Sequence, residues 1–92
     1  IDKDLKSSVK WFVRAADQGH VRAQAKLGKR YATGSGVEKS NVAALKWSLL
    51  AAQNGDISAI ENVKALKRRL SKNVVAEATR QAQSWTPNRE QK

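Results

Sequence analysis

Positive charge is the chemical feature that dominates this sequence. Its 92 residues include 18 Lys and Arg against 8 Asp and Glu, which gives a formal net charge of +10. A field of this sign attracts acidic partners and raises their rate of encounter. The competing interpretation is a solvated helix surface, since cations near a helix C-terminus are stabilised by the helix dipole. The cations form a dense run and a shorter one: Lys64, Lys67, Arg68, Arg69 and Lys72, then Lys26, Lys29 and Arg30.

Side chains able to do covalent chemistry are few. His20 is the only histidine and follows Gly19 in a predicted tight turn, and cysteine is absent. No serine has a recognisable partner base. The segment Gly34-Ser35-Gly36 is too short for a phosphate-binding loop, and no Gly-Lys-Ser/Thr follows it. We therefore expect no enzyme activity, no catalytic residue, no metal site and no cofactor.

Nucleic acid is the alternative partner that the charge suggests. The chain has only five aromatic residues, and we expect three of them, Trp11, Tyr31 and Trp47, to pack in the core. Base-stacking platforms are therefore not evident, and no helix-turn-helix, zinc or RNP-type pattern is present. Specific nucleic-acid binding is disfavoured, but charge-driven binding of nucleic acid or an anionic envelope polymer remains open. No apolar stretch approaches the roughly 20 residues of a membrane span, and no signal peptide is visible.

Apolar residues recur at three- and four-residue steps, which is the period of an amphipathic helix. Asp4 and Asp56 are plausible helix N-caps, Gly19 and Gly55 are stop signals, and Pro87 prevents continuation of the last helix. The pattern predicts five helices and no strand, over about 5–18, 21–33, 41–53, 57–70 and 73–85.

These helices belong to an internal repeat with a period of 36 residues. Between residues 1–27 and 37–63, seven aligned pairs are identical and seven more are conservative. Trp11 recurs as Trp47, Ala15-Ala16 as Ala51-Ala52, and Gly19 as Gly55. Repeats of this length stack into arrays in which each unit completes the core of its neighbour. The small alanines let helices approach closely, and we expect Gly28 to receive the bulky tryptophan of the neighbouring helix.

The spacing also resembles a known family. The pattern Ala23-x-x-x-Leu27-Gly28-x-x-Tyr31-x-x-Gly34-x-Gly36-Val37, followed by Ala44-x-x-Trp47-x-x-x-Ala51-Ala52-x-x-Gly55, is similar to the Sel1-like repeat, a relative of the tetratricopeptide repeat. The resemblance covers roughly residues 1–63 and implies an all-α, right-handed solenoid of antiparallel helix pairs. Its register gives a partial repeat (1–18), a full repeat (19–54), a divergent terminal repeat (55–72), a capping helix (73–86) and a flexible tail (87–92). Since Ile1 enters the repeat part-way, we expect a fragment of a larger protein.

The terminal repeat departs from the family pattern. Lys64, Lys67 and Leu70 replace its glycine, tyrosine and loop glycine. An array needs an atypical end unit, so we expect the helix 73–85 to dock on 57–70 as a cap through Val74, Ala78, Ala82 and Trp85. Residues 47–87 also resemble the end of the Sel1-repeat region in alphaproteobacterial polarity factors of the PodJ family. This second resemblance implies a bacterial cell-envelope protein and favours the periplasm, while a cytoplasmic location stays open.

Tetratricopeptide arrays bind partners on the concave surface lined by the first helix of each repeat. By that analogy the concave positions are Arg22, Ala25, Lys29, Ala32 and Thr33, then Ser58, Glu61, Ala65, Arg68 and Arg69. The resemblance therefore implies a non-catalytic scaffold or adaptor that binds an acidic or C-terminal segment of a protein through Arg22, Lys29, Arg68 and Arg69. The convex cations Lys10, Arg14 and Lys46 are the second candidate surface. Weak self-association through open repeat ends is a further expectation.

Overall fold

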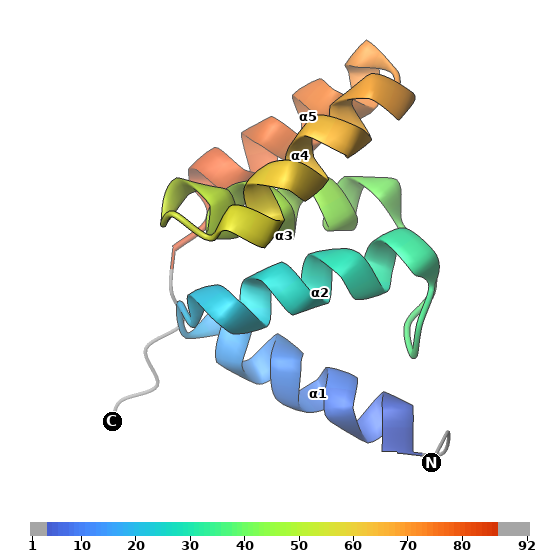
Figure 1. The fold of residues 1–92 in the computed structure, drawn as a ribbon, viewed down its shortest axis with the longest axis vertical. Helices are drawn as coiled ribbons and strands as arrows, with labels where there is room; N and C mark the ends of the chain where they lie inside the picture. Colours follow the sequence, from blue (N-terminus) through green and yellow to red (C-terminus); the bar gives the residue numbers. More distant parts are fainter. Residues whose placement is uncertain (1–3, 87–92) are drawn as a thin grey trace.

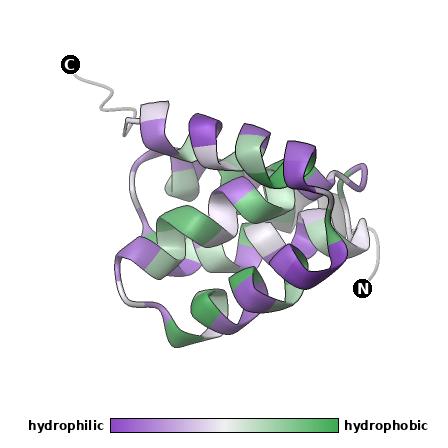
Figure 2. Cartoon of the chain, turned by 90° about the horizontal axis from the view of Figure 1, so that it is seen from above, coloured by the Kyte–Doolittle hydropathy of each residue, from purple (hydrophilic) through white to green (hydrophobic). Residues whose placement is uncertain are grey.

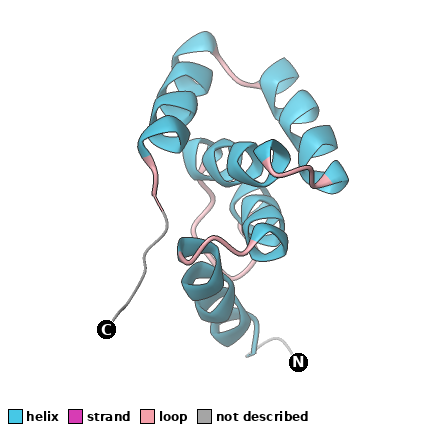
Figure 3. Cartoon of the chain, turned by 90° about the vertical axis from the view of Figure 1, so that its left-hand side faces the viewer, coloured by secondary structure: helices cyan, strands magenta, loops and turns pink. Residues whose placement is uncertain are grey.

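The fold is an all-α solenoid of five helices. A computed structural model describes residues 4–86 of the chain, and within that range it contains helices, turns and loops but no strand (Figure 3). All five predicted helices are present with ends within one residue of the expected positions. They stack in chain order, with α1 at one end and α4 and α5 at the other (Figure 1). The helices are α1 (Asp4–Asp17), α2 (Val21–Thr33), α3 (Asn41–Gln53), α4 (Ile57–Arg69) and α5 (Lys72–Ser84).

Local side-chain chemistry explains where the helices begin. The side chains of Ser40, Asp56 and Ser71 cap α3, α4 and α5 by accepting a hydrogen bond from the backbone N–H three residues later. Each satisfies a donor that the first helical turn leaves free. Asp56 is therefore confirmed as a cap. Asp4 was expected to precede α1 as its cap, but it lies within that helix.

The two tight turns repeat with the same geometry. Gly19 and Gly55 adopt φ angles of 97° and 87°, a left-handed conformation that glycine adopts without steric cost. After each glycine a backbone N–H returns to the preceding helix, from His20 to the Ala15 carbonyl (3.0 Å) and from Asp56 to the Ala51 carbonyl (3.1 Å). Turns this short make consecutive helices antiparallel neighbours, as the resemblance implied.

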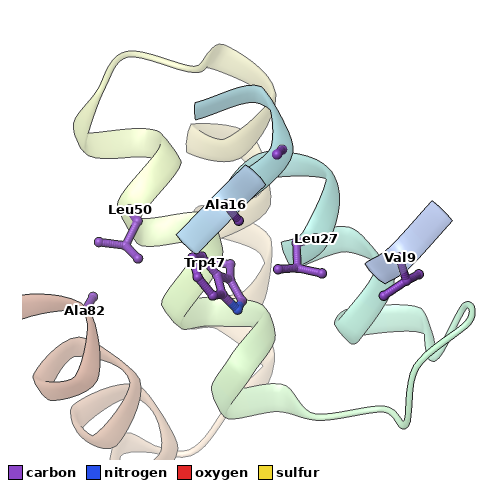
Figure 4. Packing of buried hydrophobic residues seen from close by; sticks show 7 residues of the cluster. Val9, Ala16, Leu27, Trp47, Leu50 and Ala82 are labelled. Carbon is purple, nitrogen blue, oxygen red and sulfur yellow. The ribbon is translucent and has the colours of Figure 1, made fainter. Parts of the chain in front are cut away.

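Helix α3 is the centre of the molecule, because it packs against α2, α4 and α5. Each helix carries both hydrophilic and hydrophobic residues (Figure 2), but α3 buries residues on almost every side. Trp47 is only 5% exposed, which confirms its predicted core position. Its ring meets Trp85 edge to face, with centroids 6.0 Å apart. Figure 4 shows the surrounding cluster, whose labelled members are Val9, Ala16, Leu27, Trp47, Leu50 and Ala82.

Trp11 does not pack as predicted. It is 72% exposed although it aligns with Trp47 in the repeat. The reason is its position in the stack: among residues 4–86 only α2 has extensive contact with α1, and that contact leaves the Trp11 side chain exposed.

Gly28 also has a different neighbour from the one predicted. It faces the backbone and side chain of Ser48 and the carbonyl of Ala44 on α3, and receives no tryptophan. A Cβ atom placed at Gly28 would lie 3.1 Å from the Ala44 oxygen and 3.2 Å from the Ser48 nitrogen. Because glycine has no side chain, the backbones of α2 and α3 can approach each other closely at this position.

Helix α5 divides its contacts between two helices. Ala82 and Trp85 belong to the cluster around Trp47 on α3, whereas Ala78 lies in a cluster with Val63 and Leu66 of α4. The predicted docking on the helix 57–70 is therefore present through Ala78, but the main neighbour of α5 is α3, which the prediction did not include. Within α5, Val75 joins the core cluster in place of the expected Val74.

Candidate partner-binding groove

A groove lined with cations lies between α2 and the start of α4. Its volume is about 160 Å³. We call it the cationic groove; it is lined by Arg22, Ala25, Lys26, Lys29, Asp56 and Ser58.

The helical period of α2 brings the three cations of the groove together. Arg22, Lys26 and Lys29 are spaced by four and three residues, so they are neighbours on one face of the helix. All three are exposed, while Ala23 and Leu27 of the same helix are buried. The sequence of α2 thus separates an apolar side, which anchors the helix, from a cationic side, which faces solvent.

Small residues determine how closely the walls approach. Ala25 is 6% exposed and lies in a cluster with Ala51 of α3 and Ala59 of α4. Because alanine has a short side chain, α2 and α4 can lie near each other beneath the cations. Ala25 therefore forms the apolar floor of the cationic groove.

The opposite wall is the N-terminus of α4. The Asp56 carboxylate accepts a hydrogen bond from the Ala59 N–H at 2.8 Å, so one of its oxygens is engaged in capping. Among residues 9–86 the one ion pair joins Arg80 to Glu77, far along the chain in α5. No described carboxylate is paired with Arg22, Lys26 or Lys29, and these side chains can accept an external anion.

The predicted concave residues do not all meet. Arg22, Ala25, Lys29 and Ser58 line the cationic groove. Arg68 and Arg69 are exposed in the last turn of α4 and are not among its lining residues. Glu61 and Ala65 are likewise exposed, Ala32 packs against the core of α3, and the Thr33 hydroxyl lies 2.7 Å from that of Ser35.

Two residues of the groove were not among the predicted concave residues, although Lys26 was recognised as part of a basic run. Lys26 lies between Arg22 and Lys29 on the same helical face, and its spacing from both could have identified it. Asp56 was predicted only as a helix cap. No local sequence pattern indicates that a capping residue also lines the cationic groove.

The sequence profile of the Sel1 repeat family matches residues 1–20 and 21–56, more than half of the chain. The chain belongs to the Sel1 repeat family. No curated protein matches it in a sequence comparison. Sel1 repeats are typically non-catalytic modules that bind protein partners. The described part of this Sel1 chain has no helix of the length and apolarity needed to cross a membrane.

Two further ionisable groups in the Sel1 fold have shifted pKa values. Burial lowers the pKa of Lys46, and the nearby Asp17 opposes that effect. The Lys46 ammonium lies 4.4 Å from the centroid of the Trp47 ring, which offers a cation–π contact. Hydrogen bonds from Gln81 and Arg80 lower the pKa of Glu77. Neither group lines the cationic groove.

The side chains that line the cationic groove are suited to binding an anion. His20 is exposed in the turn before α2, and its side chain makes no capping hydrogen bond. Within the described residues no three His, Cys, Asp or Glu side chains cluster as metal ligands would. The cationic groove offers three cations above an apolar floor, and no carboxylate in the described part of the chain is paired with them.

Proposed function

We propose that this Sel1-repeat chain is a non-catalytic scaffold or adaptor that binds an acidic or C-terminal segment of a partner protein. The observation that supports the proposal is the convergence of Arg22, Lys26 and Lys29 in one groove, with no described carboxylate paired to them. The segment lies over Ala25 with its carboxylates toward the cations. The Arg22 guanidinium binds a carboxylate through two parallel hydrogen bonds, which a lysine cannot do.

The energetics favour a short acidic segment. A hydrogen bond to a charged group contributes about 1.5–3 kcal/mol when it is well formed. Two or three such bonds offset much of the cost of ordering a peptide. The exposed position of the cations reduces each contribution by solvent screening, so we expect modest affinity.

Arg68 and Arg69 form the second part of the proposed binding region. They project from the last turn of α4, beyond the cationic groove. A segment of several residues that begins in the groove and follows α4 reaches them. Arg22, Lys29, Arg68 and Arg69 thus remain the proposed partner-binding residues, with Lys26 added.

The cellular context is also proposed. We place the chain in a larger bacterial Sel1-repeat protein with an envelope or polarity role, on the basis of the second sequence resemblance. The division into repeats over 1–18, 19–54 and 55–72, with α5 as a cap, belongs to the same proposal.

The test is binding of acidic peptides to charge-reversed variants. The probe is a fluorescein-labelled decapeptide rich in glutamate with a free C-terminus, and fluorescence anisotropy reports its affinity. We expect Arg22→Glu/Lys29→Glu to weaken binding by at least about tenfold, and Arg68→Glu/Arg69→Glu to weaken it less. Lys39→Glu/Lys72→Glu is the matched control, because it makes the same charge change at exposed sites that lie on neither α2 nor α4. Equal losses in all three variants would reject the groove.

A charge-driven polymer binder is the second candidate function, and the net charge of +10 favours it. Such a binder should lose affinity for DNA or another polyanion steeply with salt, because binding releases counterions. It should also respond equally to charge reversal anywhere on the surface. A peptide groove should keep part of its affinity at high salt and discriminate between peptide sequences.

A further inference from the structure

The two walls of the cationic groove carry opposite charges. Arg22, Lys26 and Lys29 of α2 form the positive wall, and Asp56 lies in the opposite wall at the start of α4. One oxygen of the Asp56 carboxylate accepts the Ala59 N–H at 2.8 Å, and no hydrogen bond among the described residues uses the other oxygen. No ion pair in the described part of the chain links Asp56 to the three cations. A bound segment therefore meets cations on one side and a carboxylate on the other.

The cations of α2 are spaced like alternate side chains of an extended chain. With a helical rise of about 1.5 Å per residue, Arg22 and Lys26 lie about 6 Å apart along the helix axis, and Lys29 lies about 4.5 Å further on. In an extended chain, side chains i and i+2 are on the same side, about 6.6 Å apart, and the side chain between them points the other way. Two carboxylates at i and i+2 can therefore face Arg22 and the pair formed by Lys26 and Lys29 at the same time.

The α4 wall favours an extended partner over a helical one. A helix pairs its backbone N–H and C=O groups internally, whereas an extended segment needs partners for these groups. Ser58 and Asp56 both line the groove, and the Ser58 hydroxyl and the second Asp56 oxygen can form hydrogen bonds with such backbone groups. A helical partner with its carboxylates toward α2 would leave both side chains without a partner.

We propose that the cationic groove recognises an extended segment in which one non-acidic residue separates two acidic ones, and that Asp56 determines this specificity. The inference rests on the proposed function and defines the sequence of the partner. One acidic side chain binds Arg22, and the second lies between Lys26 and Lys29. The residue between them points toward α4, where Asp56 would repel a carboxylate. Rejection of a wrong partner by a like charge is a common source of specificity.

Three peptides test the spacing at controlled charge. All are acetylated and amidated nonapeptides of serine, glycine and glutamate. The spaced peptide and the adjacent peptide have the same composition, with two glutamates that are separated by one serine or directly adjacent. The triple peptide replaces the separating serine by glutamate, so it carries one more negative charge. Affinity is measured by NMR titration of the isotope-labelled chain, with the backbone amides of Arg22, Lys26 and Lys29 as reporters.

We expect the spaced peptide to bind at least about fivefold more tightly than the adjacent peptide. The triple peptide should bind no more tightly than the spaced peptide, although its charge is higher. Asp56→Asn should raise the affinity of the triple peptide relative to the spaced peptide at least about fivefold, because the repelling charge is removed. Asparagine caps helices as well as aspartate does, so this variant should stay folded, which circular dichroism checks.

Glu38→Gln is the matched control for Asp56→Asn. It removes one exposed carboxylate from a residue that does not line the cationic groove. The ratio of the two affinities should therefore change by less than about twofold in this variant. If Asp56→Asn and Glu38→Gln change the ratio equally, Asp56 does not select the partner and the inference fails.

The remaining outcomes separate this inference from the proposed function. If Arg22→Glu/Lys29→Glu weakens all three peptides, but the spaced and adjacent peptides bind the unsubstituted chain equally, the groove binds acidic segments and the spacing rule is rejected. If Arg22→Glu/Lys29→Glu leaves the affinity of the spaced peptide unchanged, or if no peptide binds at millimolar concentration, the proposed function is rejected together with the inference.

Discussion

Trp47 and Trp11 have the same place in the repeat but opposite environments, and this difference predicts opposite effects of substitution. Replacing a buried large aromatic residue by alanine costs on the order of 3–5 kcal/mol. A domain of this size has little stability in reserve. We expect Trp47→Ala to unfold or nearly unfold the chain in a thermal melt followed by circular dichroism. Trp11→Ala is the control, and its free energy of unfolding should change by no more than about 0.5 kcal/mol. If Trp47→Ala lowered the melting temperature by only a degree or two, the buried core position of Trp47 would be contradicted.

Gly28 predicts an exception to a general rule for helices. Replacing glycine by alanine in a helix interior usually raises the free energy of unfolding by about 0.5–1 kcal/mol. At Gly28 the new methyl group would overlap the Ser48 hydroxyl and make an unusually short contact with the Ala44 carbonyl oxygen. We expect Gly28→Ala to lower the free energy of unfolding by about 1–3 kcal/mol, the usual cost of overpacking, as measured by urea denaturation. Gly28→Ala combined with Ser48→Gly should recover part of the loss. A stabilised single variant would show that α2 and α3 can separate easily.

At the scale of elements, α5 covers hydrophobic surface from two other helices. Its removal would expose Trp47 and Leu50 of α3 together with Val63 and Leu66 of α4. A chain that ends at Ser71 should therefore aggregate, as observed by size-exclusion chromatography with light scattering. If the shortened chain stays monomeric and equally stable, α5 is not a cap.

A pair of alanines in α5 tests the same contact without truncation. Ala82 is 4% exposed, whereas Ala76 is exposed on the same helix. Ala82→Asp places a carboxylate in the core cluster, where burial of an unpaired charge is costly. Its melting temperature should fall well below that of Ala76→Asp, which changes the charge equally. Equal melting temperatures would place α5 away from the core.

The elements could be predicted from the sequence because their signals are local. Helical periodicity, the capping residues Ser40 and Asp56, and the turn glycines each act within a few residues. What the sequence did not reveal was the outcome of tertiary contacts. Trp11 repeats the local pattern of Trp47, but burial depends on whether another helix covers the position. The docking of α5 on α3 depends in the same way on contacts between distant segments.

The candidate site was predictable to a similar extent. The helical period places Arg22 and Lys29 on one face, and the structure brings them together in the cationic groove. Arg68 and Arg69 were assigned by adding the repeat period, which does not determine which residues line a cavity. Lys26 and Asp56 line the groove because of how α2 and α4 are arranged in space.

At the scale of the whole molecule, the net charge of +10 should affect stability as well as binding. Like charges repel one another, and this repulsion disfavours the compact state. Salt shortens the Debye length from about 30 Å at 0.01 M to about 8 Å at 0.15 M. We expect the melting temperature to rise over this range of sodium chloride concentration. The Lys64→Glu/Lys67→Glu variant should show a smaller rise, since its net charge is four lower. A melting temperature that falls with salt would indicate that attractive ion pairs dominate.

The central place of α3 has a consequence for how the molecule opens. Because α3 has helices on several sides, its amide protons should exchange with solvent only when the whole chain unfolds. Within residues 4–86 helix α1 has extensive contact with one helix, so its amides should exchange through a local opening of lower free energy. Hydrogen–deuterium exchange should therefore show slow exchange in α3 and faster exchange in α1.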